Sequence, residues 1–237
     1  MRPTCRKSAA AGDAGVVRQH GNRPARLKTM IHQSLACISE DSLVQHLLSD
    51  RHWRSRLLGI RGIPDDVLTI QRVLLAGAPG GFEGDVDILL CAKNQPNVAM
   101  AIEVKRVKVG QSAFLSGRPN KLHEFDKGVR QANLLAQVGF SQVYLFVLVV
   151  VDSREQNTGI SYDGPTADLQ GIIGKTISTK DLVQRVGLMC YELVQPMDHT
   201  PLSVRTYSGH LERIAETAEQ PQPLTQWVAQ VVAQHPA

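Results

Sequence analysis

Two short apolar runs, residues 84–90 and 101–105, carry charged side chains at alternating positions. Neither run is long enough for a typical helix, and successive side chains of a strand point to opposite faces of a sheet. Glu103 and Lys105 should therefore share one face of the second strand, while Asp87 lies between apolar neighbours in the first. Charges in such apolar surroundings are costly unless they are paired or bind a metal. The runs therefore predict two paired strands that carry a polar site.

The segment from residue 39 to residue 152 alternates between helix and strand patterns. Ser39 precedes apolar residues at helical spacing and is the expected N-cap. A second amphipathic helix should end at Gly139, because glycine commonly follows a helix C-terminus. The expected elements are a helix at 39–58, strands at 67–75, 85–92 and 98–109, a helix at 122–138 and a strand at 142–152. This αβββαβ order predicts an α/β fold with a mixed central sheet flanked by helices.

The charged residues of the predicted hairpin suit metal-dependent hydrolysis of a phosphodiester. Carboxylate oxygens are the ligands that Mg2+ prefers, and the ion usually keeps waters and substrate phosphate in its shell. Asp87 and Glu103 would supply the carboxylates, and the backbone carbonyl of Val104 is a natural extra ligand. Lys105 could orient or deprotonate the attacking water, or neutralise developing charge. A solvent-facing strand with a simple Glu–Lys pair is the alternative.

The motif Gly84-x-x-Asp87, followed by Glu103-Val104-Lys105 on the next strand, resembles the PD-(D/E)xK nuclease superfamily, which has the restriction endonuclease-like fold. The resemblance covers residues 39–152. It implies that Asp87 and Glu103 bind Mg2+, with Mn2+ as a substitute, and that Lys105 is catalytic. The proline that often precedes the family's aspartate is replaced here by Val86.

Three further residues are candidates for the same site. Gln131 lies within the apolar arc of the helix at 122–138, and its position is similar to that of a glutamine in the RecB-like branch of the superfamily. It could equally be bonded to backbone at the edge of the arc. Glu40 could add a metal ligand, or simply favour the N-terminus of its helix. Asp85 is either a weaker ligand candidate or a residue at the entry to its strand.

Basic residues near this unit could contact a phosphate backbone. The candidates are Arg118, Lys121, Lys127 and Arg130. Residues 1–28 form a basic arm that is expected to be disordered. The arm could tether nucleic acid, be a solvated tail, or precede a true start at Met30.

The C-terminal extension, residues 153–237, is expected to belong to the same domain, which spans residues 29–237. A helical spacing of apolar residues predicts a helix at 181–194, and a last strand is expected at 202–207. A short final helix around Trp227 should cap the domain or mediate a homodimer. The expected fold is therefore α/β, with the nuclease-like core that the resemblance implies and C-terminal helical additions.

Composition sets broad limits on function. The chain has 237 residues, a formal net charge of +4 and no apolar run of the roughly 18 residues that span a membrane. Its mild basic bias fits a polyanionic partner. Four scattered cysteines indicate neither a zinc site nor a disulfide framework, which favours the cytoplasm.

Together with the resemblance, these features predict a Mg2+-dependent nuclease that hydrolyses phosphodiester bonds in DNA, similar to the PD-(D/E)xK endonucleases of restriction, repair or defence. Two alternatives stay open at this point. One is a catalytically silent nucleic-acid-binding or assembly module with the same fold. The other is an enzyme that acts on RNA or on another phosphate ester.

Overall fold

The computed structural model describes residues 39–49, 54, 67–109, 122–152, 179–195 and 205–235. The predicted arm at residues 1–28, the continuation of the first helix through residues 50–53 and 55–58, and the candidates Arg118 and Lys121 lie outside these residues. No helix in the described part of the chain is both long and apolar enough to cross a membrane.

A six-stranded sheet with strand order β1-β2-β3-β4-β5-β6 organises the described residues. Its strands are β1 (Leu68–Leu74), β2 (Asp85–Cys91), β3 (Met100–Val109), β4 (Gln142–Asp152), β5 (Val186–Gln195) and β6 (Arg205–Arg213). The first three strands form an antiparallel meander, β3, β4 and β5 run parallel, and β6 is antiparallel to β5. The sheet is therefore mixed, as the sequence predicts.

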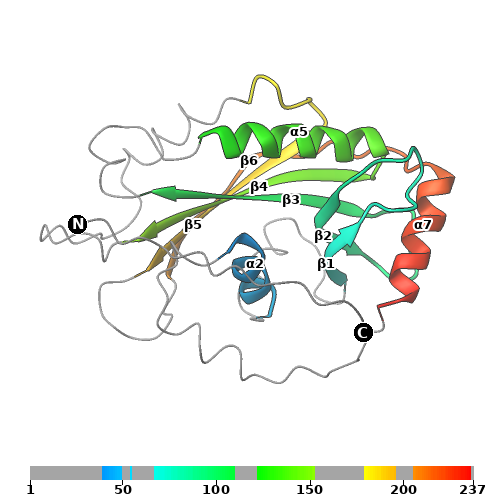
Figure 1. Cartoon of the computed structure of the whole chain (residues 1–237), viewed down its shortest axis with the longest axis horizontal. Helices are drawn as coiled ribbons and strands as arrows, with labels where there is room; N and C mark the ends of the chain where they lie inside the picture. The colour runs from blue at the N-terminus through cyan, green and yellow to red at the C-terminus, as the bar shows by residue number, and fades with distance from the viewer. Residues whose placement is uncertain are drawn as a thin grey trace, which may run out of the picture.

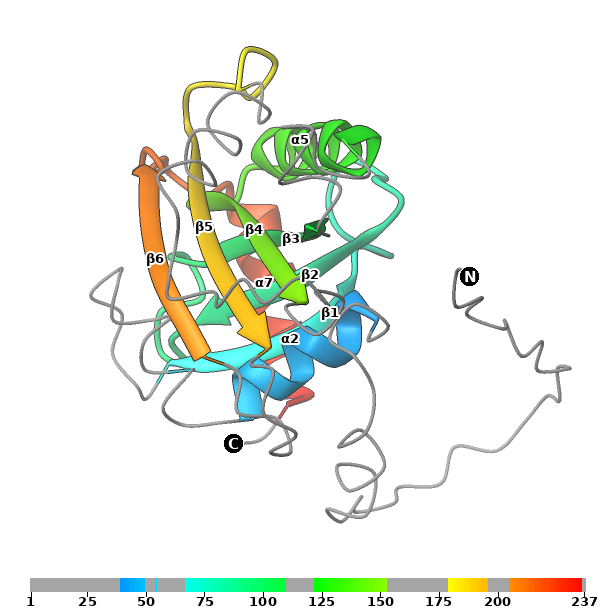
Figure 2. The ribbon, with the colours of Figure 1, turned by 90° about the vertical axis from the view of Figure 1, so that its left-hand side faces the viewer.

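Helices cover both faces of the sheet (Figures 1 and 2). Helix α5 (Leu122–Val138) lies on one face, α2 (Glu40–Ser49) lies on the other, and α7 (Gln222–Ala233) packs at the end near β1 and β2. Two buried apolar clusters follow this division, because alternate residues of β3 and β4 face α5 or α2. The domain thus has three layers, and the central strands β3 and β4 are buried on both faces.

The order α2-β1-β2-β3-α5-β4 confirms the predicted αβββαβ sequence of elements. Helix α5 and strand β4 begin and end at the predicted residues. The side chain of Ser39 accepts a hydrogen bond from the amide of Ser42 at 3.1 Å, which confirms it as the N-cap of α2. The apolar arc of α5 is buried as expected (Phe125, Val129, Ala132, Leu135 and Ala136).

The predicted helix at residues 181–194 is wrong. Most of this segment is β5, which pairs in parallel with β4 from Val143↔Val186 onward. Residues 186–191 are all buried, and a continuous apolar run of this length is compatible with either a buried helix or a buried strand. Pairing with β4 decides the outcome here.

The C-terminal extension therefore adds two strands to the sheet as well as a helix, so its description as purely helical additions is wrong. Strand β6 begins within the predicted strand but extends to Arg213. Helix α7 confirms the predicted final helix, and Leu224, Trp227 and Val228 are buried against the core. Whether α7 also mediates a dimer stays a prediction.

Gly187 allows β5 to pack closely against its neighbours. A Cβ atom there would overlap the ring of Tyr144 and lie 2.7 Å from the backbone nitrogen of Ala215. The Tyr144 hydroxyl also accepts a hydrogen bond from the Ala215 amide at 3.0 Å, so the ring is fixed in place. We expect Gly187→Ala to lower the free energy of unfolding by about 1–3 kcal/mol, as overpacking typically does. Urea denaturation measures this loss, and an unchanged midpoint would contradict the packing described.

Candidate active site

Asp87 lies where the hydrogen-bonded ladder is interrupted on both sides of β2. The β2–β3 pairing ends at Ile88↔Ile102, one position before Asp87 would face Glu103. On the other side, the β1–β2 pairs omit Asp87 and the residue opposite it, Arg72. Strand β2 therefore separates from β3 at Asp87, and the edge of β3 is open to side chains.

Two carboxylates occupy this open edge of β3. The Val104 amide donates a hydrogen bond to Oδ2 of Asp87 at 2.7 Å, and the Arg106 amide donates to Oε2 of Glu40 at 2.5 Å. Buried backbone amides require acceptors, and here side chains replace the missing strand. Asp87 comes from β2 and Glu40 from the first turn of α2, so the edge joins residues that are distant in the sequence.

Lys105 lies among these acids. Its Nζ donates to the carbonyl of Val104 at 2.8 Å, and it is 2.5 Å from Oε1 of Glu103 and 3.6 Å from Oε1 of Glu40. The stem of Lys105 packs on Gly128 of α5, where a Cβ atom would overlap Cγ of the lysine. The structure thus brings the predicted acids and lysine together, and Glu40 with them.

Glu103 is the most deeply buried charged group of the site, with 1% of its surface exposed. Neither of its oxygens accepts a hydrogen bond of regular geometry from the described residues, so its ion pair with Lys105 is its polar contact there. Burial and the nearby charge of Asp87 raise the pKa of Glu103 to about 8, although Lys105 opposes the shift. This carboxyl group therefore lacks the hydrogen-bond donors that would stabilise its charge.

The pKa values of Asp87 and Lys105 are also shifted. Burial raises the pKa of Asp87 to about 6, although the Val104 amide and Lys105 favour its charged form. Burial alone would lower the pKa of Lys105, but the surrounding carboxylates, Glu103 foremost, raise it above its ordinary value. Without a metal, Glu103 therefore keeps its proton to a higher pH than Asp87 does, while the lysine remains charged.

These shifts predict that the stability of the metal-free protein depends on pH. A carboxyl group whose pKa rises on folding binds more protons in the folded state, so the free energy of unfolding falls as pH rises. For Glu103 the window runs from the ordinary glutamate pKa of 4.5 to about 8, and Asp87 adds to it between 3.8 and about 6. The slope can reach about 1.4 kcal/mol per pH unit for each proton.

Urea denaturation across this pH range, with a metal chelator present, measures the slope. Glu103→Gln carries no titratable group at this position, so its stability should depend less steeply on pH between 6 and 8. Equal slopes for wild type and Glu103→Gln would contradict the raised pKa of Glu103.

The residues present fit a divalent cation. Glu103 is a buried carboxylate whose oxygens accept no hydrogen bond of regular geometry from the described residues, and a bound cation would satisfy them. Among the residues that the structure describes, no three Asp, Glu, His or Cys side chains form a group that could hold a metal by themselves. An ion held by Asp87 and Glu103 would therefore need the Val104 carbonyl, water or substrate oxygens, which is usual for Mg2+.

The structure also describes the other residues that were predicted for the site or its surroundings. Oε1 of Gln131 is buried without a hydrogen-bond partner in the described structure, so this oxygen does not make the backbone bond that was the alternative to a role in the site. Asp85 lies 3.7 Å from Nε of Arg72, and its charge acts on the pKa of Asp87. Lys127 and Arg130 are exposed on α5 and so remain available for a polyanion.

The placement of Glu40 beside β3 and the contacts of Arg72 were not predicted from the sequence. Glu40 looked like an acid that favours a helix N-terminus, and nothing local shows that α2 places it beside β3. Arg72 lies within a strand pattern, but its backbone is left-handed, with φ 55°, and it contacts Asp41 at 3.0 Å. The two adjacent acids, Glu40 and Asp41, which precede the apolar residues of α2, were the feature of the sequence that could have indicated these contacts.

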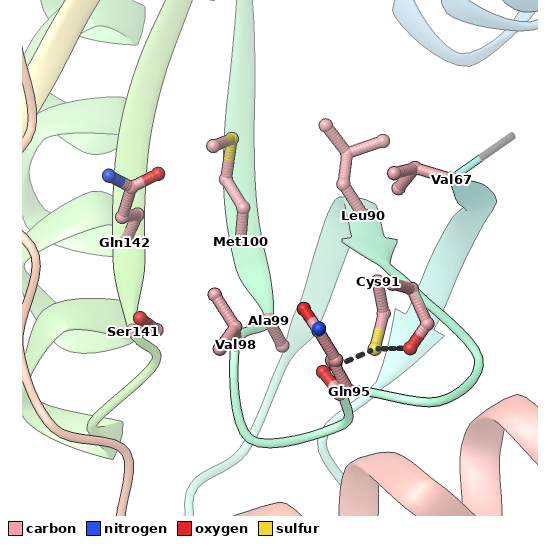
Figure 3. A pocket seen from close by; sticks show the side chains of 10 residues that line it. Val67, Leu90, Cys91, Gln95, Val98, Ala99, Met100, Ser141 and Gln142 are labelled. Atoms are coloured by element: carbon pink, nitrogen blue, oxygen red, sulfur yellow. Dashed lines mark hydrogen bonds between the residues drawn. The ribbon is translucent and has the colours of Figure 1, made fainter. Parts of the chain in front are cut away.

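A separate pocket of about 180 Å3 lies at the other end of β3 (Figure 3). Its lining is mainly apolar and includes Leu90, Val98 and Met100. Cys91 is buried beside it, with Sγ 3.3 Å from the carbonyl of Ala92, and burial raises the pKa of its thiol to about 11. A thiol with that pKa is a poor nucleophile at neutral pH, so the pocket lacks the reactive groups of the β3 edge.

Comparisons of the chain with protein-family models, with curated protein sequences and with solved structures found no match. The function proposed below therefore depends on the residues and geometry of the site.

Proposed function

We propose that the protein is a metal-dependent nuclease of the PD-(D/E)xK type that hydrolyses phosphodiester bonds in DNA. The observation that carries the proposal is the convergence of Asp87, Glu103 and Lys105 at the open edge of β3. The αβββαβ order that the motif requires supports it. A solvent-facing Glu–Lys pair does not explain a glutamate that is 1% exposed and a lysine that is 8% exposed.

Asp87 and Glu103 would hold Mg2+, with Mn2+ as a substitute, and the Val104 carbonyl and Glu40 are further oxygen donors at the same edge. A divalent ion there would supply a more acidic water and electrostatic stabilisation of the phosphate in the transition state. Binding would require both carboxyl groups to lose their protons, so metal affinity should increase with pH.

Lys105 is best suited to neutralise charge on the phosphate. Its raised pKa keeps the ammonium group protonated near neutral pH, which favours this role over that of a general base. Contact with Glu103 and the Val104 carbonyl holds Nζ beside the proposed metal ligands. Gln131, Lys127 and Arg130 on α5 would extend the site toward the substrate.

The experiment is a cleavage assay on plasmid DNA, linear DNA and RNA with Mg2+, with Mn2+ and with EDTA. We expect cleavage of DNA that requires the divalent ion and stops in EDTA. A double variant, Asp87→Asn with Glu103→Gln, purified in the same way, controls for contaminating nucleases. Cleavage of RNA alone would favour the RNA-directed alternative. Nucleic-acid binding without any cleavage would favour the silent binding module, and either result would contradict the proposal.

A further inference from the structure

Arg72 has a backbone conformation that strands rarely contain. Its φ of 55° makes it the one non-glycine residue with positive φ in the described part of the chain. An L-residue is strained in this left-handed region, and such strain often occurs near functional sites. Arg72 also faces Asp87 across the hairpin, at the position that the β1–β2 pairs omit.

The conformation of Arg72 coincides with a change in which side of the hairpin faces the α5 cluster. Ile70 and its partner Leu89 are buried in that cluster, whereas Ile88 packs in the cluster beside α2. Three residues further along β1, Val73 and its partner Val86 return to the α5 cluster. In a regular strand, residues three apart face opposite sides. The hairpin is therefore rotated at Arg72 and Asp87.

The Arg72 side chain connects two elements that carry acids of the site. Its Nη1 lies 3.0 Å from Oδ2 of Asp41, and its Nε lies 3.7 Å from Oδ2 of Asp85. Asp41 follows Glu40 in the first turn of α2, and the side-chain amide of Gln71 also donates to the Asp41 carbonyl at 2.9 Å. The side chains of two successive residues of β1 thus contact the same helix end, which a regular strand would not allow.

We propose that Arg72 is a positioning residue for the carboxylate site, through two separable effects. Its left-handed backbone rotates the hairpin so that Asp87 reaches the Val104 amide. Its guanidinium holds Asp41, and thereby places Glu40 on the Arg106 amide. The inference concerns the site of the proposed nuclease, but it can be tested without metal or substrate, so the two can fail separately.

Hydrogen exchange of the Val104 and Arg106 amides separates these effects. Arg72→Gly keeps the left-handed backbone and removes the guanidinium. The Arg106 amide should then exchange about two- to fivefold faster, as expected for loss of an exposed ion pair, while the Val104 amide is unchanged. Arg72→Val also disfavours the left-handed backbone, so both amides should exchange faster. The Val147 amide in β4, between β3 and β5, is the control for global unfolding.

Wild-type exchange at both amides in Arg72→Val would overturn the inference. Equal acceleration of the Val104 amide in both variants would overturn the backbone effect, because glycine preserves that conformation. If Arg72→Val does not fold, Arg72→Gly alone tests both effects. Unchanged exchange of the Arg106 amide in Arg72→Gly would overturn the role of the guanidinium. Faster exchange of the Val104 amide in Arg72→Gly would overturn the role of the backbone.

Discussion

Replacing Lys105 with alanine is expected to lower the rate of metal-dependent DNA cleavage by about 10²–10³-fold, the range for removing one group that stabilises charge in the transition state. The Lys105 ammonium contacts Glu103 and the Val104 carbonyl, and no other lysine contacts either group in the described part of the chain. Because Lys105 is not proposed to bind the metal, Mn2+ affinity should change less than the rate. Single-turnover cleavage and calorimetry with Mn2+ measure the two quantities.

Two further variants make the result specific. Lys105→Met retains a long stem that can pack on Gly128 but has no charge, so it should lose activity as alanine does while preserving the fold. Lys93→Ala removes an exposed lysine from the turn at the opposite end of β2 and should leave the rate unchanged. Full activity in Lys105→Ala would exclude the lysine from the chemistry.

Replacing Asp87 with asparagine is expected to weaken Mn2+ binding by about tenfold or more, since metal affinity depends strongly on the charge of the ligands. Asparagine retains an oxygen that can accept the hydrogen bond that Val104 donates at 2.7 Å, so the β3 edge should stay intact. Loss of the Asp87 charge should also lower the pKa of Glu103, because that charge raises it. Calorimetry with Mn2+ in the absence of DNA measures the affinity directly.

Asp85→Asn is the matched control, because Asp85 is in the same strand and lies near Arg72 instead of on the β3 edge. Its effect on Mn2+ affinity should be small. If Asp85→Asn weakened Mn2+ binding as much as Asp87→Asn, the assignment of Asp87 as the principal ligand of β2 would be incorrect.

The elements that carry the site follow from local sequence patterns. Amphipathic spacing and Gly139 define α5, and the apolar run that begins at Val143 defines β4. The grouping of Asp87, Glu103 and Lys105 could be predicted because strand alternation and a short turn constrain their relative positions. These features depend on residues that are close in the sequence.

What the sequence did not predict depends on tertiary pairing. Glu40 joins the site because α2 packs across the sheet and places a carboxylate on the Arg106 amide. Strand β5 has apolar residues at helical spacing, and it is a strand because β4 offers an edge for parallel pairing. The left-handed backbone of Arg72 has no local signal such as glycine. Each of these features is decided by neighbours that are distant along the chain.

A crystal structure determined with Mn2+ tests the central claim most directly, because anomalous scattering locates the ion. We expect a peak between the carboxylates of Asp87 and Glu103, next to the Val104 carbonyl, at the open edge of β3. That peak should be absent from crystals of the Asp87→Asn variant grown under the same conditions. Mn2+ bound elsewhere, or no bound Mn2+ at a pH above 8 where Glu103 is charged, would contradict a metal-dependent active site at this position.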